Sequence, residues 1–420
     1  MIRAHAGDYI ASRGGTIPWP HVRVLHELAA CRTAALGGHA WECDTCGGIE
    51  VAYNSCRNRH CPTCGGSARA EWLEGLRQEL LPTSYFHLVF TLPSELSPVV
   101  QQNPEPLYNL LFRAAWETLE QVGADPRHLG AQLGALLVLH TWNQRLEHHP
   151  HVHCVLPAGG LAPDGSRWVP SPSKDFFLPV RVLSALFRGK YLAGLKRAWQ
   201  NGELKLEGNK LLPLADERQF EAWLSPLYAR DWVVYAQPPP PDCGPEAVLK
   251  YLARYVSGVA IANSRLVSLT NGQVAFRWKN RRKNRTETQT LSAAEFLRRF
   301  LLHVLPTGFV RIRRYGLWAN NHRAAKLTRC RELLGTPPSV SVPCALDPIA
   351  PKAAADDDVP VAERERQCPW CAAGRLHFAA SRPRPASWME LLQLPLWRLA
   401  NSPAAQGERS AAAPQGSNTS

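Results

Sequence analysis

In the stretch His148-His149-Pro150-His151-Val152-His153-Cys154-Val155-Leu156-Pro157, four histidines fall within six residues. Its histidines are followed by apolar and β-branched residues that are typical of a strand. His151 and His153 are two residues apart, so on a strand their side chains leave the same face, with Cα atoms roughly 6.6 Å apart. Two imidazoles placed in this way can share one metal ion. The alternative is a polar strand edge with surface histidines, and the rest of the chain must decide between the two.

The composition favours a basic globular protein that binds an anionic polymer. The chain has 420 residues, of which 45% are hydrophobic, and this length suggests two or three units. Its formal charge of +13 and pI near 9.3 favour nucleic acid as a partner. No apolar run approaches the roughly 18 residues needed to span a bilayer, and the N-terminus lacks the apolar core of a signal peptide. We therefore expect a cytoplasmic protein with no membrane partner.

The cysteines predict structural zinc. The sequence has 12 of them, and six crowd into residues 31–64, where two Cys-x-x-Cys pairs occur. Each such pair presents two thiolates to one ion, and two pairs complete a tetrahedral zinc site. The first expected set is Cys43, Cys46, Cys61 and Cys64. A possible second set, for which packed or exposed side chains are an equal alternative, is Cys31, His39, Cys56 and His60.

Hydrophobic periodicity predicts alternating helices and strands along the middle of the chain. The expected helices cover residues 67–81, 105–122, 180–200 and 293–304. The expected strands cover 85–93, 133–142, the histidine stretch and 231–236. Strand 133–142 and the histidine stretch are separated by a short polar connection, so they could form a hairpin. Asn271-Gly272 predicts a second hairpin between 266–269 and 274–278.

A further helix is expected at 246–256, and it carries Tyr251 and Tyr255. Because these tyrosines are four residues apart, their side chains would lie one turn apart on one helix face. Such a pair is usually amphipathic packing. Beside a metal-binding strand in a basic protein, we instead interpret the two hydroxyl groups as nucleophiles.

Two basic clusters are expected to contact the DNA backbone, although runs of this kind are often only solvated surface. The first surrounds Trp278, whose ring offers a face on which a base can stack. The residues of the first cluster are Arg277, Lys279, Arg281, Arg282, Lys283 and Arg285. The second cluster consists of Arg311, Arg313 and Arg314.

From about residue 336 the composition shifts to Pro, Ala, Ser and acidic residues, which predicts a mostly disordered tail. Cys368-Pro369-Trp370-Cys371 within it looks like half of a zinc knuckle without an evident second pair. The expected domains are a zinc-binding domain at 1–80, a nuclease core with the tyrosine helix at 81–265, a basic extension at 266–335 and the tail at 336–420.

These motifs together resemble the HUH two-tyrosine rolling-circle transposases of bacterial insertion sequences. The resemblance covers residues of roughly 20–330 and rests on His151-Val152-His153, Tyr251-Leu-Ala-Arg-Tyr255 and the knuckle Asn54–Cys64. It implies an α+β fold, with an antiparallel sheet flanked by helices and a small N-terminal zinc-ribbon-like domain. It also implies nicking and rejoining of single-stranded DNA at the ends of the element, through a 5′-phosphotyrosine.

Carried over by position, the resemblance makes His151 and His153 ligands of Mg²⁺ or Mn²⁺, and Tyr251 and Tyr255 the nucleophiles. His149, on the same face but roughly 13 Å from His153 at Cα in an extended strand, and His87 both remain candidates for the third ligand. The implied partners are transposon ends, target DNA and host replication or helicase machinery, in the bacterial cytoplasm near the nucleoid. A related replication or mobilisation nuclease, and a non-catalytic zinc-dependent DNA-binding protein, are the alternative functions.

Overall fold

The computed structural model describes residues 1–173, 177–237, 258–281, 283–335 and 366–385, together with 387 and 389. These residues form two compact units. Unit 1 contains the described residues of 1–68, 261–304 and 350–420, and unit 2 contains those of 69–260 and 305–349. No helix among the described residues is both long enough and apolar enough to cross a bilayer.

Unit 2 is built on a five-stranded sheet in which every neighbouring pair of strands is antiparallel. The order of the strands across the sheet is β12-β4-β5-β3-β8. Their bounds are β3 (Tyr85–Thr91), β4 (Gly134–Trp142), β5 (His148–Pro157), β8 (Val234–Gln237) and β12 (Ile312–Gly316). Strand β5, which contains the histidine stretch, is therefore the central strand. A small hairpin of β6 (Gly159–Leu161) and β7 (Trp168–Pro170) follows it.

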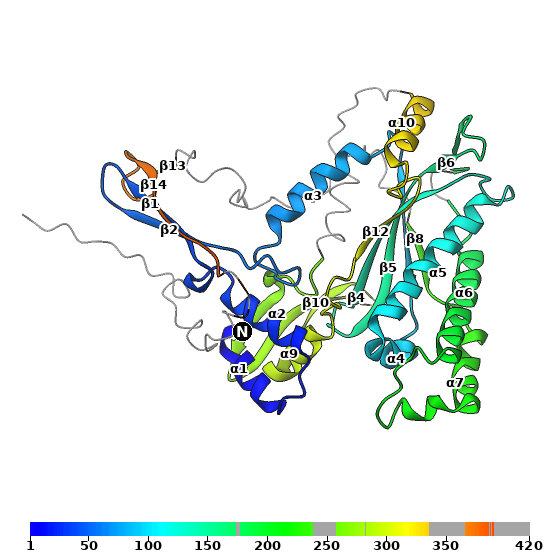
Figure 1. Cartoon of the computed structure of the whole chain (residues 1–420), viewed down its shortest axis with the longest axis horizontal. Coiled ribbons are helices and arrows are strands. Elements are labelled where there is room, and N and C mark those ends of the chain that lie inside the picture. The colour runs from blue at the N-terminus through cyan, green and yellow to red at the C-terminus, as the bar shows by residue number, and fades with distance from the viewer. Residues whose placement is uncertain are drawn as a thin grey trace, which may run out of the picture. The chain divides into compact units, whose positions relative to one another are not determined.

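Helices cover one face of this sheet and bury the main hydrophobic core (Figure 1). They are α4 (Ser97–Gln102), α5 (Pro104–Ala124), α6 (Val180–Gln200) and α7 (Glu217–Ala229). Val152, Cys154 and Leu156 of β5 point into this core. Helices α5 and α6 approach closely at Gly194, where a Cβ atom would lie 2.3 Å from Cδ1 of Leu110. The alternation of side chains along β5 places His149, His151 and His153 on the other face, whereas His148 lies on the same face as Val152.

The second face of the sheet carries a smaller core under α3 (Gly66–Glu79) and α10 (Arg323–Leu334). Val155 of β5 and Leu136 of β4 pack there with Leu327 of α10. The carboxylate of Glu79 at the end of α3 accepts a hydrogen bond from Nε of Arg314 in β12 at 2.9 Å. This contact ties α3 to the edge strand.

Among the described residues, unit 1 contains two sheets, three complete α-helices and two short 3-10 helices. The complete α-helices are α1 (Ile2–Ser12), α2 (Trp19–Ala30) and α9 (Ala293–Leu301), and α9 packs against α1. One sheet has the order β11-β10-β9, formed by β9 (Leu266–Thr270), β10 (Gln273–Asn280) and β11 (Arg285–Ser292). The other has the order β13-β14-β1-β2, formed by β1 (Gly38–Cys43), β2 (Ile49–Tyr53), β13 (Arg366–Gln367) and β14 (Arg375–Arg382).

The structure confirms the expected α+β class and the hairpin at Asn271-Gly272, where both residues have positive φ. It divides the chain differently from the expected domains, because β9, β10, β11 and α9 belong to unit 1 and not to an extension of the core. Within the expected tail, residues 375–382 form a strand that pairs with β1. The reason lies in tertiary contacts between distant segments. Helix α9 packs against α1, and the strand at 375–382 pairs with β1, in each case across hundreds of residues of sequence.

Gly316 gives a test of how tightly β12 is held against β4. Its φ is +60°, and a Cβ atom there would lie 2.0 Å from the carbonyl oxygen of Leu133. Gly308 also has a positive φ of +77° but no neighbour within 4 Å of a Cβ atom. We expect Gly308→Ala to cost about 1 kcal/mol of unfolding free energy, from the left-handed conformation alone. Gly316→Ala should reduce the free energy of unfolding by an additional ~1–3 kcal/mol, because the new Cβ atom would overlap the backbone of Leu133 and force it to move. Urea denaturation of the two variants measures the difference, and equal costs would contradict this packing.

Candidate metal centre and DNA-binding residues

Three histidines converge on the face of the sheet opposite to α5 and α6. His151 and His153 come from β5 and His140 comes from β4, and one ring nitrogen of each lies within 4.8 Å of the others. His140 and His153 are buried, and His151 is half-buried. Three convergent imidazoles form a donor set suited to a divalent transition metal.

Hydrogen bonds orient two of these rings. Nδ1 of His151 lies 2.7 Å from the carbonyl oxygen of His149, so Nδ1 carries the proton and Nε2 the lone pair. Nδ1 of His153 lies 2.8 Å from Nε2 of His87, and the two rings are stacked. Burial lowers the pKa of His87 to about 4, so this ring is neutral at physiological pH, and its Nε2 can accept a hydrogen bond from Nδ1–H of His153. In both histidines the nitrogen that can bind a metal is then Nε2.

The third member of the cluster is His140, not His149 or His87 as expected. His149 is outside the group of converging nitrogens. His87 instead contacts the ligand candidate His153 through a hydrogen bond, which makes it a positioning residue. His148 also has a structural role, because its Nε2 lies 2.9 Å from the hydroxyl group of Tyr108.

Strand pairing explains why His140 was missed. In the β4–β5 register His140 lies directly opposite His151, and Val138 lies opposite His153. Residues opposite each other in an antiparallel pair project to the same face, so His140 joins the row of histidines. The sequence contains part of the signal, since 133–142 is a predicted strand that could form a hairpin with the histidine stretch. The connection 143–147 did not reveal the register.

The expected nucleophiles Tyr251 and Tyr255 lie outside the described residues. The segments on either side of them both belong to unit 2. On the far side, Nη1 of Arg311 donates a 2.8 Å hydrogen bond to the carbonyl oxygen of Gly258. The backbone carbonyl of Arg311 in turn accepts from the amide of Leu139, next to His140.

The second basic cluster has intramolecular partners. Arg313 lies over the ring of Phe112, with its Cζ 4.2 Å from the ring centroid, and also bonds the side chain of Asn109. Arg314 is paired with Glu79 and Arg311 with Gly258, as described above. These contacts hold β12 and the residue before it to their neighbours within unit 2, and DNA contacts by the three arginines stay a prediction.

The first basic cluster lies on the β10–β11 hairpin of unit 1. Arg277, Lys279, Arg281, Lys283 and Arg285 are all exposed. Lys283 and Arg285 share Glu287, at 3.4 and 2.9 Å. Arg282 lies outside the described residues. DNA contacts by this hairpin stay a prediction, and its exposed cations are compatible with it.

The cysteines group differently from the expected sets. Cys61 and Cys64 converge with Cys31 and Cys56, and the Sγ atoms of Cys56 and Cys64 are 3.5 Å apart. Cys43 and Cys46 converge instead with Cys368 and Cys371. His39 and His60 belong to neither group, and the ring of His39 packs near Trp41 and Phe378. The expected set of Cys43, Cys46, Cys61 and Cys64 is therefore wrong, because the pairing of β1 with β14 brings a distant knuckle beside Cys43.

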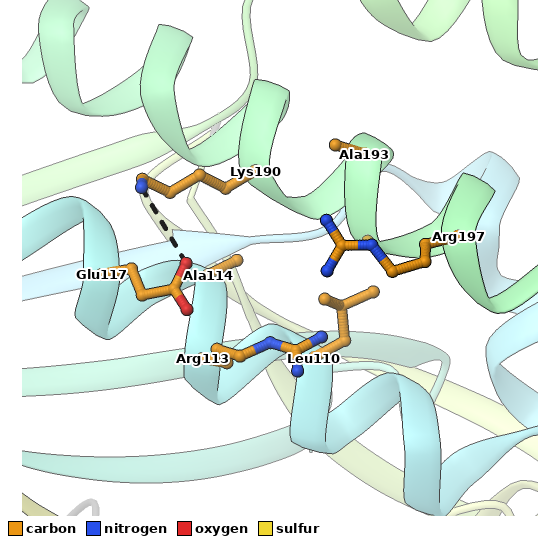
Figure 2. A pocket seen from close by; sticks show the side chains of 8 residues that line it. Leu110, Arg113, Ala114, Glu117, Lys190, Ala193 and Arg197 are labelled. Carbon is orange, nitrogen blue, oxygen red and sulfur yellow. Dashed lines mark ion pairs between the residues drawn. The ribbon is translucent and has the colours of Figure 1, made fainter.

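A pocket of about 220 Å³ between α5 and α6 is unrelated to the histidines (Figure 2). It is lined by Arg113, Lys190 and Arg197, and Lys190 forms an ion pair with Glu117, with Nζ 3.9 Å from Oε2. Helices α5 and α6 cover the face of the sheet that carries Val152 and Cys154, so this pocket and the three histidines lie on opposite sides.

Comparisons with known proteins agree with this architecture. Residues 134–326 match a family model described as "Putative transposase", and residues 1–92 match one described as "Transposase zinc-binding domain". The chain is 51% identical to "Putative transposase y4qJ" of Sinorhizobium fredii over 84% of this chain and 87% of that protein. It is 30% identical to the transposase for insertion sequence element IS801 of Pseudomonas savastanoi pv. phaseolicola, over 74% of each chain. No solved structure gives a significant match.

The class defined by the sheet, its histidines and the zinc-binding domain is thus that of DNA transposases. Within that class, the chain belongs to the IS91/IS801 family of insertion-sequence transposases. The resemblance to HUH transposases with an N-terminal zinc-binding domain is confirmed. The substrate of this transposase is DNA. The zinc-binding family model and the cysteine clusters support structural zinc in the protein.

The metal centre can be tested by comparing His140→Ala with His149→Ala. Removing His140 leaves two converging imidazoles, so we expect Mn²⁺ affinity to fall by at least ~100-fold, whereas His149→Ala should retain affinity within a few-fold. A larger loss of Mn²⁺ affinity in His149→Ala than in His140→Ala would indicate that His149 is the third ligand. Isothermal titration with Mn²⁺, on protein whose cysteine sites are loaded with zinc, gives both affinities.

Proposed function

We propose that this transposase nicks and rejoins single-stranded DNA at the ends of its element through a 5′-phosphotyrosine intermediate. The observation that carries the proposal is the convergence of His140, His151 and His153 on one face of an antiparallel sheet. A divalent cation held by these side chains would supply positive charge to the scissile phosphate. The proposal extends to Tyr251 and Tyr255 because they are the nucleophiles that the family resemblance assigns.

The chemistry conserves bond energy. A tyrosine oxygen attacks phosphorus, the bond to the 3′ oxygen breaks, and that oxygen takes up a proton to become a free 3′-hydroxyl. Attack by another 3′-hydroxyl on the phosphotyrosine then restores a phosphodiester and releases the tyrosine. Two tyrosines allow two such transfers, so that one end of the element is held while the other is cut. No nucleotide hydrolysis is needed.

The described residues beside the tyrosines support this assignment. Tyr255 is three residues from Gly258, so covalent geometry limits their Cα atoms to a separation of roughly 11 Å. The carbonyl oxygen of Gly258 accepts a hydrogen bond from the side chain of Arg311. The carbonyl oxygen of Arg311 accepts one from the amide of Leu139, next to His140. Gly258 is therefore tied through Arg311 to the strand that provides one of the three histidines.

A covalent adduct is the first expected outcome. With Mn²⁺ and a single-stranded oligonucleotide from an element end, we expect protein linked to DNA that survives denaturing electrophoresis. Tyr251→Phe/Tyr255→Phe should abolish the adduct, because neither position then offers a nucleophilic oxygen. Tyr235→Phe, at an exposed tyrosine on β8, is the matched control and should leave it unchanged. An undiminished adduct in the double variant would overturn the assignment of the tyrosines.

The donor set also predicts which metal works best. Imidazole suits Mn²⁺ and other transition metals better than Mg²⁺, which prefers oxygen ligands. We therefore expect half-maximal cleavage at a Mn²⁺ concentration at least ~10-fold lower than that of Mg²⁺. Cleavage titrations with each metal measure this ratio. Equal requirements would indicate that oxygen ligands, rather than the three imidazoles, dominate the site.

Binding and cleavage should separate in the histidine variants. His151→Ala/His153→Ala should lose cleavage while retaining binding of the same oligonucleotide, measured by fluorescence anisotropy at fixed salt. If the protein acted only as a zinc-dependent DNA-binding module, neither the wild type nor the double variant would cleave the oligonucleotide. Cleavage that persists in the double variant would place the metal elsewhere.

A further inference from the structure

Two Cys-x-x-Cys knuckles from opposite ends of the chain have similar local hydrogen bonding, although the second is closed one residue later than the first. In the first, the amide of Gly47 donates to the carbonyl of Cys43, and the amide of Cys43 donates to the carbonyl of Gly48. In the second, Ala372 donates to Cys368, and Cys368 to Gly374. The residue after the second cysteine has a positive φ in both, +65° at Gly47 and +55° at Ala372.

The four thiols of these knuckles face one another. Sγ of Cys43 lies 3.7 Å from that of Cys371, and Sγ of Cys46 lies 3.7 Å from that of Cys368. These separations exceed a disulfide bond of about 2.05 Å. They match the edge of a tetrahedron with zinc–sulfur distances of about 2.3 Å, which is roughly 3.8 Å.

Backbone amides donate hydrogen bonds to two of the four sulfur atoms. The amide of Trp370 donates to Sγ of Cys368 at 3.4 Å. The amide of Gly374 donates to Sγ of Cys371 at 3.3 Å. Such N–H···S bonds stabilise the negative charge on sulfur.

The rest of the sheet holds the knuckles together without relying on the thiols. Strand β1 pairs with β14 from Gly38↔Arg382 to Cys43↔Leu376. The side chain of Asp44, beside the first knuckle, accepts a 2.9 Å hydrogen bond from the amide of Arg375, beside the second. Trp41 and Leu376 are buried together with Cys43 and Cys368 in a small core.

We propose that Cys43, Cys46, Cys368 and Cys371 bind a second structural zinc, which closes a zinc ribbon whose two knuckles come from opposite ends of the chain. The other group of four cysteines that could hold a metal ion is Cys31, Cys56, Cys61 and Cys64. The zinc-binding family model ends at residue 92 and so contains only half of the ligands of this second site. Residues 366–382 are thereby a part of the same folded sheet as β1 and β2.

The test counts zinc per chain in the full-length protein. All variants carry His151→Ala/His153→Ala, so that the histidine cluster contributes no zinc. We expect two zincs in this background, and one after Cys43→Ser/Cys46→Ser or after Cys368→Ser/Cys371→Ser. The quadruple serine variant should also retain one, since both pairs share one ion. Inductively coupled plasma mass spectrometry on gel-filtered protein gives the counts.

Cys330→Ser is the matched control, because Cys330 is a buried thiol that belongs to neither cluster, and it should keep two zincs. Two zincs in Cys368→Ser/Cys371→Ser would overturn the proposal. So would a quadruple variant with no zinc while each double variant keeps one, because the pairs would then bind separate ions.

A second pair of variants keeps every cysteine. A Cβ atom on Gly374 would lie 2.5 Å from Sγ of Cys43, so Gly374→Val should force the knuckles apart and reduce the count to one. Ala372→Gly, two residues away, removes only the strain of a positive φ and should keep two. Retention of the remaining zinc in Gly374→Val shows that unit 1 is still folded. Two zincs in Gly374→Val would contradict the shared site.

Discussion

The register between β4 and β5 is the constraint on which the candidate metal centre depends. It places His140 opposite His151, so that a histidine from each strand projects to the same face as His153. A shift of one residue would turn His140 into the core under α5 and α6. The register is held by the apolar side chains on the other face, such as Leu137, Leu139 and Val152, which are fully buried in that core. The packing of one face therefore sets the chemistry of the other.

Hydrogen bonds from neighbouring groups orient two of the three histidines. His87 and the carbonyl of His149 each engage an Nδ1 atom, which leaves Nε2 as the metal-binding nitrogen of His153 and His151. The arginines of β12 contribute indirectly. Arg314 binds Glu79 of α3 and Arg313 packs on Phe112 of α5, so the edge strand is fixed to helices on both faces of the sheet. Arg313 and Arg314 thus stabilise the sheet that carries the histidines.

Unit 1 shows how pairing over a long sequence separation changes the meaning of a motif. Cys43-x-x-Cys46 and Cys61-x-x-Cys64 are near each other in sequence, and their spacing suggested one zinc site. In the structure each belongs to a different group, because β14 pairs with β1 and brings Cys368 and Cys371 beside the first knuckle. Cys31 and Cys56 complete the second group.

The sequence by itself determined the α+β class, most strands and helices of the core, the resemblance to HUH transposases and the pair His151 and His153. Those features follow from local periodicity and from residues close together in the chain. Only the tertiary structure decided the third histidine, the grouping of the cysteines and the assignment of residues 261–304 to unit 1. Each of these depends on strand register or on contacts between distant segments, which local patterns do not encode. Hydrophobic burial and backbone hydrogen bonding together determine the strand register and the contacts between distant segments.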